Sequence, residues 1–442
     1  MSAQIFLNFT DDPNRNYIGW SPARCAIRTT DNTPRTVRLR NGDTGVGGQV
    51  VFAHTPTGPM QDELDVALPT DNGLAQFYCA GKFDHATGQG YASTVDGDAS
   101  IQVMEGTNSL MVQRLMVRVR KDAETLTPGE RDLFLSALVD LNSNGGFVDF
   151  QNMHTSDTSR EIHGRSCFLP WHRLYLLDLE RKLQAIEASV TLPYWRFDKP
   201  APYLFTEDFI GVPDSTGIVQ FSSSNPLVNW RLSVFGEGSG RIRRTYRQKN
   251  DGTTFDPTIE GALIDNDESD TLNLGTTNPG TSTEQTNFRN FERMETDPHG
   301  RAHTSFRGQV SEIGRAPADP LFFLLHNNVD RLWARWQWLR DRQNPDSSDV
   351  YYKRGTGPIN PDPRRAHADR IGNFIEDTLW PWNGVVGDPR PRTAPGTYYP
   401  ASPIIGVPDR YPDIRSAIDF QGQIDLIQNL GFHYDDVPYD FA

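Results

Sequence analysis

The chain has 442 residues, a length at which two domains are more common than one. It is 36% hydrophobic and 23% charged, as an ordinary soluble protein is, and its net charge of −14 argues against nucleic-acid or anionic-membrane partners, because both require basic patches. No apolar run approaches the roughly 20 residues of a membrane-spanning helix, so no membrane partner is expected.

The first region, residues 1–108, has the pattern of an all-β domain. Short runs rich in β-branched and aromatic residues, such as 35–40 and 49–54, are separated by clusters of glycine, asparagine, aspartate and proline. Asn41-Gly42 is typical of a tight hairpin turn. The sequence therefore predicts a small β-sandwich or barrel, whose role it does not indicate.

The second region, residues 109–442, has the pattern of a mainly α-helical domain. Thr127-Pro-Gly-Glu130 is a capping box with proline at the first helical position, and the helix that follows is predicted to end at Gly145. Further helices are predicted to begin at Pro170 and at Asp319-Pro320. The fold class predicted is α+β, with separate β and α domains.

Two long stretches of the second region lack helical periodicity. Residues 213–290 are rich in glycine, serine, threonine and asparagine, which predicts a long surface loop. Beyond about residue 345 the chain is rich in proline and aspartate, apart from a short amphipathic segment near residues 414–430. We interpret this part as a wrap around the helical core.

Six of the ten histidines fall into two triplets. His299 and His303 lie four positions apart, so on a helix both rings project from one face, and His326 lies on a later helix whose apolar face directs its ring into the core. Any one of these histidines could be an ordinary core or surface residue, but two ordered triplets favour a two-metal centre. All-imidazole sites suit copper, zinc, iron and nickel. The triplets are His154, His163 and His172, and His299, His303 and His326.

The sequences around these histidines resemble the copper A and copper B blocks of the tyrosinase, catechol oxidase and haemocyanin family. The copper A helix is similar to Phe168–Leu176 (FLPWHRLYL). The copper B helix is similar to Asp319–Trp333 (DPLFFLLHNNVDRLW), and the helix before it to Pro298–His303. The similarity extends from about Leu115 to Tyr434 and leaves out the β region.

This resemblance implies a type 3 copper polyphenol oxidase in which a four-helix bundle holds two copper ions, one on each histidine triplet. Such an enzyme uses O2 to oxidise o-diphenols to o-quinones and, in some relatives, to hydroxylate monophenols. Phenols and O2 are then the expected small-molecule partners, and a protein that delivers copper is a further expected partner. The alternatives are an O2 carrier of haemocyanin type, an oxidase of o-aminophenols, and a binding protein with a degenerate site, against which the six intact histidines speak.

Several residues near the second triplet bear on the reaction. Many relatives have asparagine directly after the first copper B histidine, where it helps to position a water that deprotonates monophenols. Here that position holds Gly300, so we expect diphenol oxidation to exceed monophenol hydroxylation. Glu295 is the candidate catalytic carboxylate beside that water, or else a helix cap. Thr304 and Ile313 fall where relatives line the substrate entrance.

Asp330 lies four residues after His326, on the same helical face. It could accept a hydrogen bond from the far ring nitrogen of a ligand and so fix its tautomer. The equally supported alternative is a surface ion pair with Arg331.

The end of the chain carries a second resemblance to the family. Phe432-His-Tyr434 is similar to an aromatic-x-Tyr element that in relatives pairs with an early arginine, here Arg118 or Arg120. Tyr439 in the short tail is a candidate plug for the copper pocket, against the simpler interpretation of a disordered terminus. His433, like the other three histidines outside the triplets, is predicted to be an ordinary surface residue.

The three cysteines, Cys25, Cys79 and Cys167, lie far apart and without metal-type spacing. An odd, sparse count fits buried thiols in a reducing compartment better than a disulfide framework. The start of the chain lacks the basic and apolar regions of a signal peptide, so a cytoplasmic location is expected.

Overall fold

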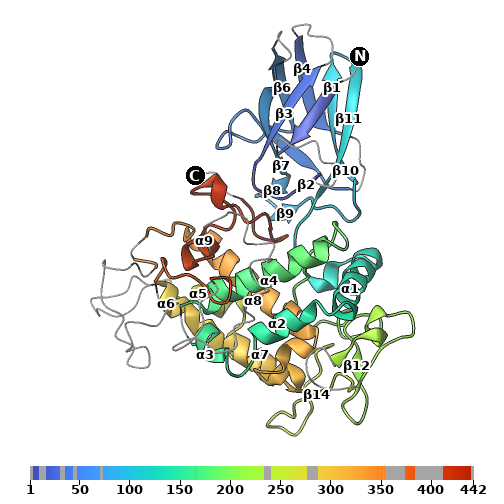
Figure 1. Cartoon of the computed structure of the whole chain (residues 1–442), viewed down its shortest axis with the longest axis vertical. Helices are drawn as coiled ribbons and strands as arrows, with labels where there is room; N and C mark the ends of the chain where they lie inside the picture. The colour runs from blue at the N-terminus through green and yellow to red at the C-terminus, as the bar shows by residue number, and fades with distance from the viewer. Residues whose placement is uncertain are drawn as a thin grey trace. The chain divides into compact units, whose positions relative to one another are not determined.

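The structure of the chain, a computed structural model, divides into two compact units. The first comprises Met1–Arg120 and Phe420–Ala442, and the second comprises Lys121–Asp419. Figure 1 draws the strands of the first unit in blue to cyan. The structure describes residues 3–8, 16–29, 35–42, 47–69, 73–164, 166–232, 240–275, 287–347, 349–351, 353, 374–383 and 412–439.

The first unit is built from β-strands. These are β1 (Ala3–Leu7), β2 (Tyr17–Ile18), β3 (Ala23–Thr29), β4 (Arg35–Asn41), β5 (Val50–Ala53), β6 (Glu63–Leu68), β7 (Ala75–Gly81), β8 (Phe83–Asp84), β9 (Gln89–Gly90), β10 (Ala99–Glu105) and β11 (Asn108–Val117). One sheet has the antiparallel order β1-β3-β7-β5. The other has the order β2-β11-β10-β4-β6, in which β2 and β11 run parallel. Burial alternates along β6, as it does in a strand with one face on the core.

The two sheets share one hydrophobic core, so the unit is a β-sandwich. Ile27 of β3 and Val103 of β10 are fully buried members of this core. Tyr439 belongs to the same core and is buried there. Its ring packs among the strands of the sandwich, so the prediction that it plugs the metal site is wrong.

The first unit extends beyond the boundary that the sequence pattern indicated at residue 108. Asn108–Val117 is a full strand of the second sheet, and Phe420–Ala442 also belongs to this unit. Gly106 has a φ of +58° and forms the turn between β10 and β11. Because the first half of β11 is largely exposed, it lacks the alternation by which a strand is recognised in a sequence.

The second unit is mainly helical. Its helices are α1 (Pro128–Ser143), α2 (Phe147–Met153), α3 (Ser159–Ile162), α4 (Phe168–Gln184), α5 (Glu268–Asn273), α6 (Asn287–Phe291), α7 (Arg301–Thr304), α8 (Leu321–Arg340) and α9 (Ile414–Ile418). The capping box of α1 is confirmed, since Thr127 Oγ1 accepts from Glu130 N at 3.2 Å and Glu130 Oε2 accepts from Thr127 N at 2.9 Å. Helix α4 begins at Phe168, ahead of the predicted start at Pro170, and α8 begins directly after Pro320 as predicted. The two long helices α4 and α8 pack against each other.

The stretch 213–290, predicted as a long loop, contains short elements in its described part. These include β13 (Val219–Gln220), which pairs with β12 (Val212–Pro213), and β14 (Arg244–Tyr246), which pairs with β15 (Phe306–Gly308). Arg244 is buried, and its Nη2 donates to Asp319 Oδ1 at 2.6 Å, just before α8. The sequence could not show β14, because its partner β15 lies far away along the chain. Residues 233–239 and 276–286 lie outside the described residues.

The C-terminal segment of the first unit is anchored by Arg120. Its Nη1 donates to Tyr434 Oη at 2.9 Å, and its guanidinium lies 3.9 Å from the centre of the Phe432 ring. This confirms the predicted pairing of the aromatic-x-Tyr element with an early arginine. His433, predicted to lie on the surface, is instead buried, with Nε2 2.6 Å from Ser21 Oγ.

The three cysteines are free and buried, as predicted.

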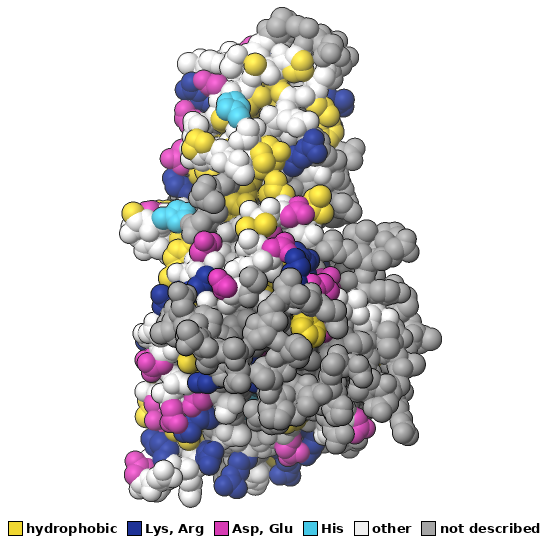
Figure 2. Space-filling view, turned by 90° about the vertical axis from the view of Figure 1, so that its left-hand side faces the viewer, with side chains coloured by type: hydrophobic (Ala, Val, Ile, Leu, Met, Phe, Trp, Pro, Cys, Tyr) yellow, Lys and Arg dark blue, Asp and Glu magenta, His cyan; other side chains and the backbone are white. Residues whose placement is uncertain are grey.

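Figure 2 shows acidic and basic side chains interspersed on the face that it presents. No helix in the described part of the chain is long and apolar enough to cross a membrane.

Candidate dicopper site

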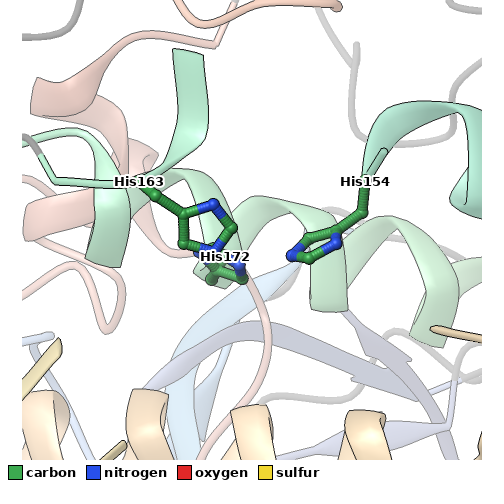
Figure 3. Close-up of side chains that lie close together, drawn as sticks. All are labelled: His154, His163 and His172. Atoms are coloured by element: carbon green, nitrogen blue, oxygen red, sulfur yellow. The ribbon is translucent and has the colours of Figure 1, made fainter. Parts of the chain in front are cut away.

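The structure brings the six predicted histidines together in the second unit as two triads. In each triad the candidate ligand atoms lie within 4.8 Å of one another. The ring centroids are 5.1–5.6 Å apart in the first triad and 4.8–5.2 Å apart in the second. Figure 3 shows the rings of the first triad converging on a common space. The first triad is His154, His163 and His172, and the second triad is His299, His303 and His326.

The first triad is placed by two helix ends and one long helix. His154 and His163 are the first residues after α2 and α3, and both have non-helical backbone angles. His172 lies in α4, where its neighbours along the helix are almost all buried. The C-terminal ends of α2 and α3 and one face of α4 therefore direct three rings to one point.

The second triad is placed by one interrupted helical turn and one long helix. His299 lies in the π-helical turn Thr296–Gly300, and His303 follows in α7, so the predicted pair on one helical face is confirmed. His326 lies in α8 and is fully buried.

Backbone carbonyls fix the tautomer of four of the rings. A carbonyl oxygen can only accept a hydrogen bond, so each ring nitrogen that contacts one must carry the proton. The remaining Nε2 of each ring then presents a lone pair, which is the form that binds a metal ion. The contacts run from His154 Nδ1 to Ile313 O (3.0 Å), His172 Nδ1 to Phe168 O (2.8 Å), His299 Nδ1 to Glu295 O (2.7 Å) and His303 Nδ1 to Val310 O (2.6 Å).

Among the described residues, the lone pairs that result have no adequate partner. The Nε2 atoms of His154 and His172 are buried and make no hydrogen bond to this part of the chain. In the second triad, His326 Nε2 lies 3.3 Å from His299 Nε2 and 3.1 Å from His303 Nε2, and one proton cannot serve both contacts. A cation at the centre of each triad would satisfy all of these atoms, so the residues present fit a metal ion.

The protein keeps these imidazoles neutral. Burial, together with repulsion from neighbouring histidines, lowers the pKa of His154 to about 3, and burial lowers the pKa of His303 to about 4. Burial, with added repulsion from the other rings, also holds the pKa of His326 well below its ordinary value. Neutral nitrogen donors without a carboxylate suit copper better than the hard cations magnesium and calcium.

One short segment holds a ring from each triad. The carbonyl of Val310 accepts from His303, and the carbonyl of Ile313 accepts from His154. The same segment is fixed from the side of α2, because Gln151 Nε2 donates to Gly314 O at 2.9 Å. Residues 310–314 therefore couple the positions of the two triads.

Glu295, the predicted catalytic residue, forms a second link between the triads. Its backbone carbonyl holds the ring of His299, while its side-chain Oε1 accepts from Gly164 N at 2.7 Å. Gly164 directly follows His163 in the chain. The carboxylate is half-buried, so it lies at the margin of the site rather than simply capping a helix in solvent.

A third link joins α4 and α8. The rings of His172 and His326 stack with centroids 4.4 Å apart and planes 12° apart. One residue after His172, buried Arg173 donates from Nε to Asp330 Oδ1 at 2.5 Å. His326 Nδ1 makes no hydrogen bond to any described residue, Asp330 included, so Asp330 does not orient that ligand as predicted. Nor does it form a surface pair with Arg331, because both residues are buried.

The predicted entrance residues lie around the second triad. Thr304 is exposed, and its Oγ1 donates to Gly300 O at 3.0 Å. The side chain of Ile313 is also exposed, although its carbonyl holds His154. That Gly300, Thr304 and Ile313 line an entrance to the metal site stays a prediction.

Sequence reasoning missed two kinds of residue in this site. Arg173 was within the copper A block, directly after His172, and its position there was the available signal. Val310 was not predicted at all, and Ile313 was predicted only as an entrance residue; both hold a ligand through a backbone carbonyl, for which the side-chain sequence gives no signal.

Comparison with known proteins agrees with this geometry. Residues 144–339 match the family described as the common central domain of tyrosinase. A tyrosinase of Streptomyces glaucescens is 34% identical over 285 residues, which cover 60% of this chain and 92% of that protein. A G-type haemocyanin of Enteroctopus dofleini is 27% identical over 271 residues, 57% of this chain and 8% of that protein. A solved structure of a functional unit of octopus haemocyanin is 19% identical. The match covers 74% of this chain and 70% of the haemocyanin chain, with a TM-score of 0.45. The chain therefore belongs to the tyrosinase family of copper oxidoreductases, and its two histidine triads fit the two copper ions that this family uses.

Proposed function

We propose that the protein is a polyphenol oxidase that uses O2 to oxidise o-diphenols to o-quinones. The observation that carries this proposal is the convergence of two triads of neutral imidazoles, in which backbone carbonyls set the tautomers of four of the six rings. Two bound copper ions would supply adjacent one-electron redox couples, which together can transfer two electrons to O2. The four-helix arrangement expected around such a pair is part of this proposal.

The residues of the chain would hold and admit the reactants. The carbonyls of Val310, Ile313 and Glu295 keep the rings of His303, His154 and His299 in place. The exposed side chains of Thr304 and Ile313 leave an uncharged rim for an aromatic ring. Glu295 is the carboxylate available to take part in deprotonating a monophenol.

The second candidate function is an O2 carrier, which the similarity to haemocyanin supports. The same ligands would serve it, but a carrier must keep phenols out of the pocket. The exposed entrance residues Thr304 and Ile313 therefore favour the oxidase.

The deciding experiment is a substrate panel on copper-loaded protein. Paired monophenols and diphenols, together with o-aminophenols, are mixed with the protein in air while quinone absorbance and O2 consumption are recorded. If the protein is an oxidase, the copper-loaded form should turn over catechol steadily. Copper-free protein is the control. Reversible O2-dependent colour without quinone would show a carrier, and preferred turnover of o-aminophenols would reassign the substrate class.

The Gly300→Asn variant should raise the ratio of monophenol to diphenol turnover. An amide at this position would add a partner for a water beside the second triad. The new Cβ would lie 3.3 Å from Glu295 O, which is close enough to press on the carbonyl that holds His299. Gly300→Ala is the matched control, because it adds the same Cβ without the amide. A ratio that is equal in the two variants would contradict the role of the amide.

The Glu295→Gln variant should lower monophenol turnover more than diphenol turnover. Glutamine can still accept the hydrogen bond from Gly164 N, so the link between the triads is kept while the negative charge is lost. A monophenol must lose the proton of its single hydroxyl before it is hydroxylated, so its turnover is expected to depend on the negative charge more than that of a diphenol. Glu295→Ala, which also removes the link, should impair both activities; equal losses in Glu295→Gln would leave the residue with a structural role alone.

A further inference from the structure

The ribbon formed by β14 and β15 presents arginine side chains on its outer face. Thr245 of β14 lies directly opposite Arg307 of β15, so the two side chains share a face. Both residues are exposed, whereas the neighbouring Arg244 is buried, so the face that they share is the outer one. Arg243 and Arg247 lie two positions before and after Thr245 and are also exposed. They are therefore the diagonal neighbours of Arg307, at a spacing that long side chains can bridge.

The ribbon is attached to the backbone that carries the second triad. β15 begins three residues after His303, and two residues after its end lies Val310, whose carbonyl holds the ring of His303. The pairing of the two chain segments continues beyond β14, because Arg247 N donates to Ser305 O at 3.0 Å. The outer face of the ribbon is therefore held in a constant position relative to the second triad.

An aromatic cluster supports the ribbon from its inner face. The ring of Phe306 in β15 lies 5.5 Å from that of Phe255 and 5.7 Å from that of Trp195, measured between ring centroids. On the same face Arg244 pairs with Asp319, and both side chains are fully buried. The backbone of the outer arginines is therefore in place before a ligand arrives, which lowers the entropy that is lost on binding.

Arg247 lies beside the predicted entrance to the metal site. Its Nη1 donates to Thr304 O at 3.4 Å, and Thr304 directly follows His303 in the chain. A guanidinium group has five N–H donors in a planar fork, and among the described residues this side chain uses one of them. An aromatic ring that enters beside the uncharged side chain of Thr304 therefore has a guanidinium group close to its outer end.

Arg247 and Arg307 place positive charge on the outer face of the ribbon. Neither forms an ion pair with a described residue, whereas Arg301 of α7 pairs with Asp265 at 2.9 Å. Two like charges held as diagonal neighbours repel each other, and an anion bound between them relieves that repulsion. The outer face of the ribbon is thus suited to hold a negatively charged group.

We propose that Arg247, with Arg307 beside it, binds a carboxylate of the substrate, so that the preferred substrates are o-diphenols with a carboxylate on a short side chain. Planar guanidinium and carboxylate groups can form two parallel hydrogen bonds. This substrate class rests on the proposed oxidase function and on the entrance beside Thr304. Arg247 acts on the end of the substrate that does not react, so it determines specificity and takes no part in the oxidation.

Steady-state kinetics of the full-length copper-loaded protein tests this proposal. The probes are 3-(3,4-dihydroxyphenyl)propanoate and its uncharged methyl ester. Arg247→Gln should raise the KM of the acid about fivefold, as the loss of an exposed ion pair does. It should leave the KM of the ester and both kcat values unchanged, because a contact with the remote end of the substrate is alike in the ground state and the transition state.

Two further variants separate charge from structure. Arg247→Lys keeps the charge and should retain most of the preference for the acid. Arg247→Glu should reverse the preference, so that the KM of dopamine, a cationic o-diphenol, falls below its value in the parent. Arg340→Gln is the control for a change in net charge, because Arg340 lies 14 residues beyond His326 on α8, about 21 Å away. It should leave the KM of the acid unchanged.

A binding measurement complements the kinetics. 3-Phenylpropanoate has no hydroxyl group to oxidise, so its affinity for the copper-loaded protein can be measured by calorimetric titration without turnover. Arg247→Gln should weaken the binding of 3-phenylpropanoate about fivefold and leave the binding of uncharged 3-phenylpropanamide unchanged. Equal binding of 3-phenylpropanoate by the parent and by Arg247→Gln would overturn the proposal.

The kinetic outcomes distinguish this proposal from the proposed function. Absence of catechol turnover would overturn the oxidase and this substrate class together. Turnover of catechol with the same acid-to-ester ratio of KM in the parent and in Arg247→Gln would overturn the substrate class alone. An equal rise in both KM values would show that Arg247 acts only through its contact with Thr304 O, which also overturns it. Circular dichroism verifies each fold, and Arg307→Gln decides the result if Arg247→Gln does not fold.

Discussion

Replacing His172 or His326 with alanine is expected to leave one copper ion fewer per chain and no diphenol turnover. Each residue supplies one of only three imidazoles in its triad, and both are fully or almost fully buried. Their rings also stack on each other at 4.4 Å, so the loss of one removes packing from the other. Two remaining imidazoles leave a coordination set that no longer matches the metal.

Metal content per chain, measured by elemental analysis after copper loading, checks this expectation beside the turnover of catechol. His54→Ala and His85→Ala are the matched controls, because both histidines are exposed and lie in the first unit. They should keep two copper ions and full activity. Two copper ions and normal turnover in either triad variant would contradict the assignment of the ligands.

The copper-free protein is expected to lose stability steeply as the pH falls below 6.5. The pKa of His154 is lowered from 6.5 to about 3 and that of His303 to about 4, chiefly by burial. Between the ordinary and the lowered values the unfolded chain binds a proton on each ring that the folded chain does not. These two groups therefore leave the free energy of unfolding unchanged above pH 7. In mild acid each of them lowers the free energy of unfolding by about 1.4 kcal/mol per pH unit.

Urea unfolding of copper-free protein at a series of pH values between 7 and 4.5 measures this loss. His303→Phe, which removes one buried base, should reduce the slope of unfolding free energy against pH. His54→Ala, a substitution at an exposed position in the first unit, is the control and should leave the slope unchanged. A slope that is the same in His303→Phe and in the parent would contradict the buried, neutral state of that ring.

The parts of the fold that depend on local chemistry could be predicted from the sequence. The capping box at Thr127 and the start of α8 after Pro320 are examples, since each depends on a few adjacent residues. The extent of the first unit could not be predicted. It depends on the pairing of β10 with a half-exposed strand, and on Phe420–Ala442, whose contact between Tyr434 and Arg120 was expected from the family resemblance and not from the residue pattern.

The same distinction applies to the site. The histidines lie in two sequence blocks whose residue types and spacing indicate metal ligands, and the structure gathers each triad. The groups that orient them are mostly carbonyls, such as that of Val310, which any residue would provide. The role predicted for Asp330 was wrong because its position on the helix face did not reveal that Arg173 would lie beside it.

The segment from Val310 to Gly314 contacts one ring of each triad, so copper binding at one triad is expected to be thermodynamically linked to copper binding at the other. A copper ion on the second triad would restrain His303, and through Val310 it would restrain the carbonyl of Ile313 that holds His154. The first triad would then have less conformational entropy to lose on binding its ion, so the second binding event is expected to be favoured over the first.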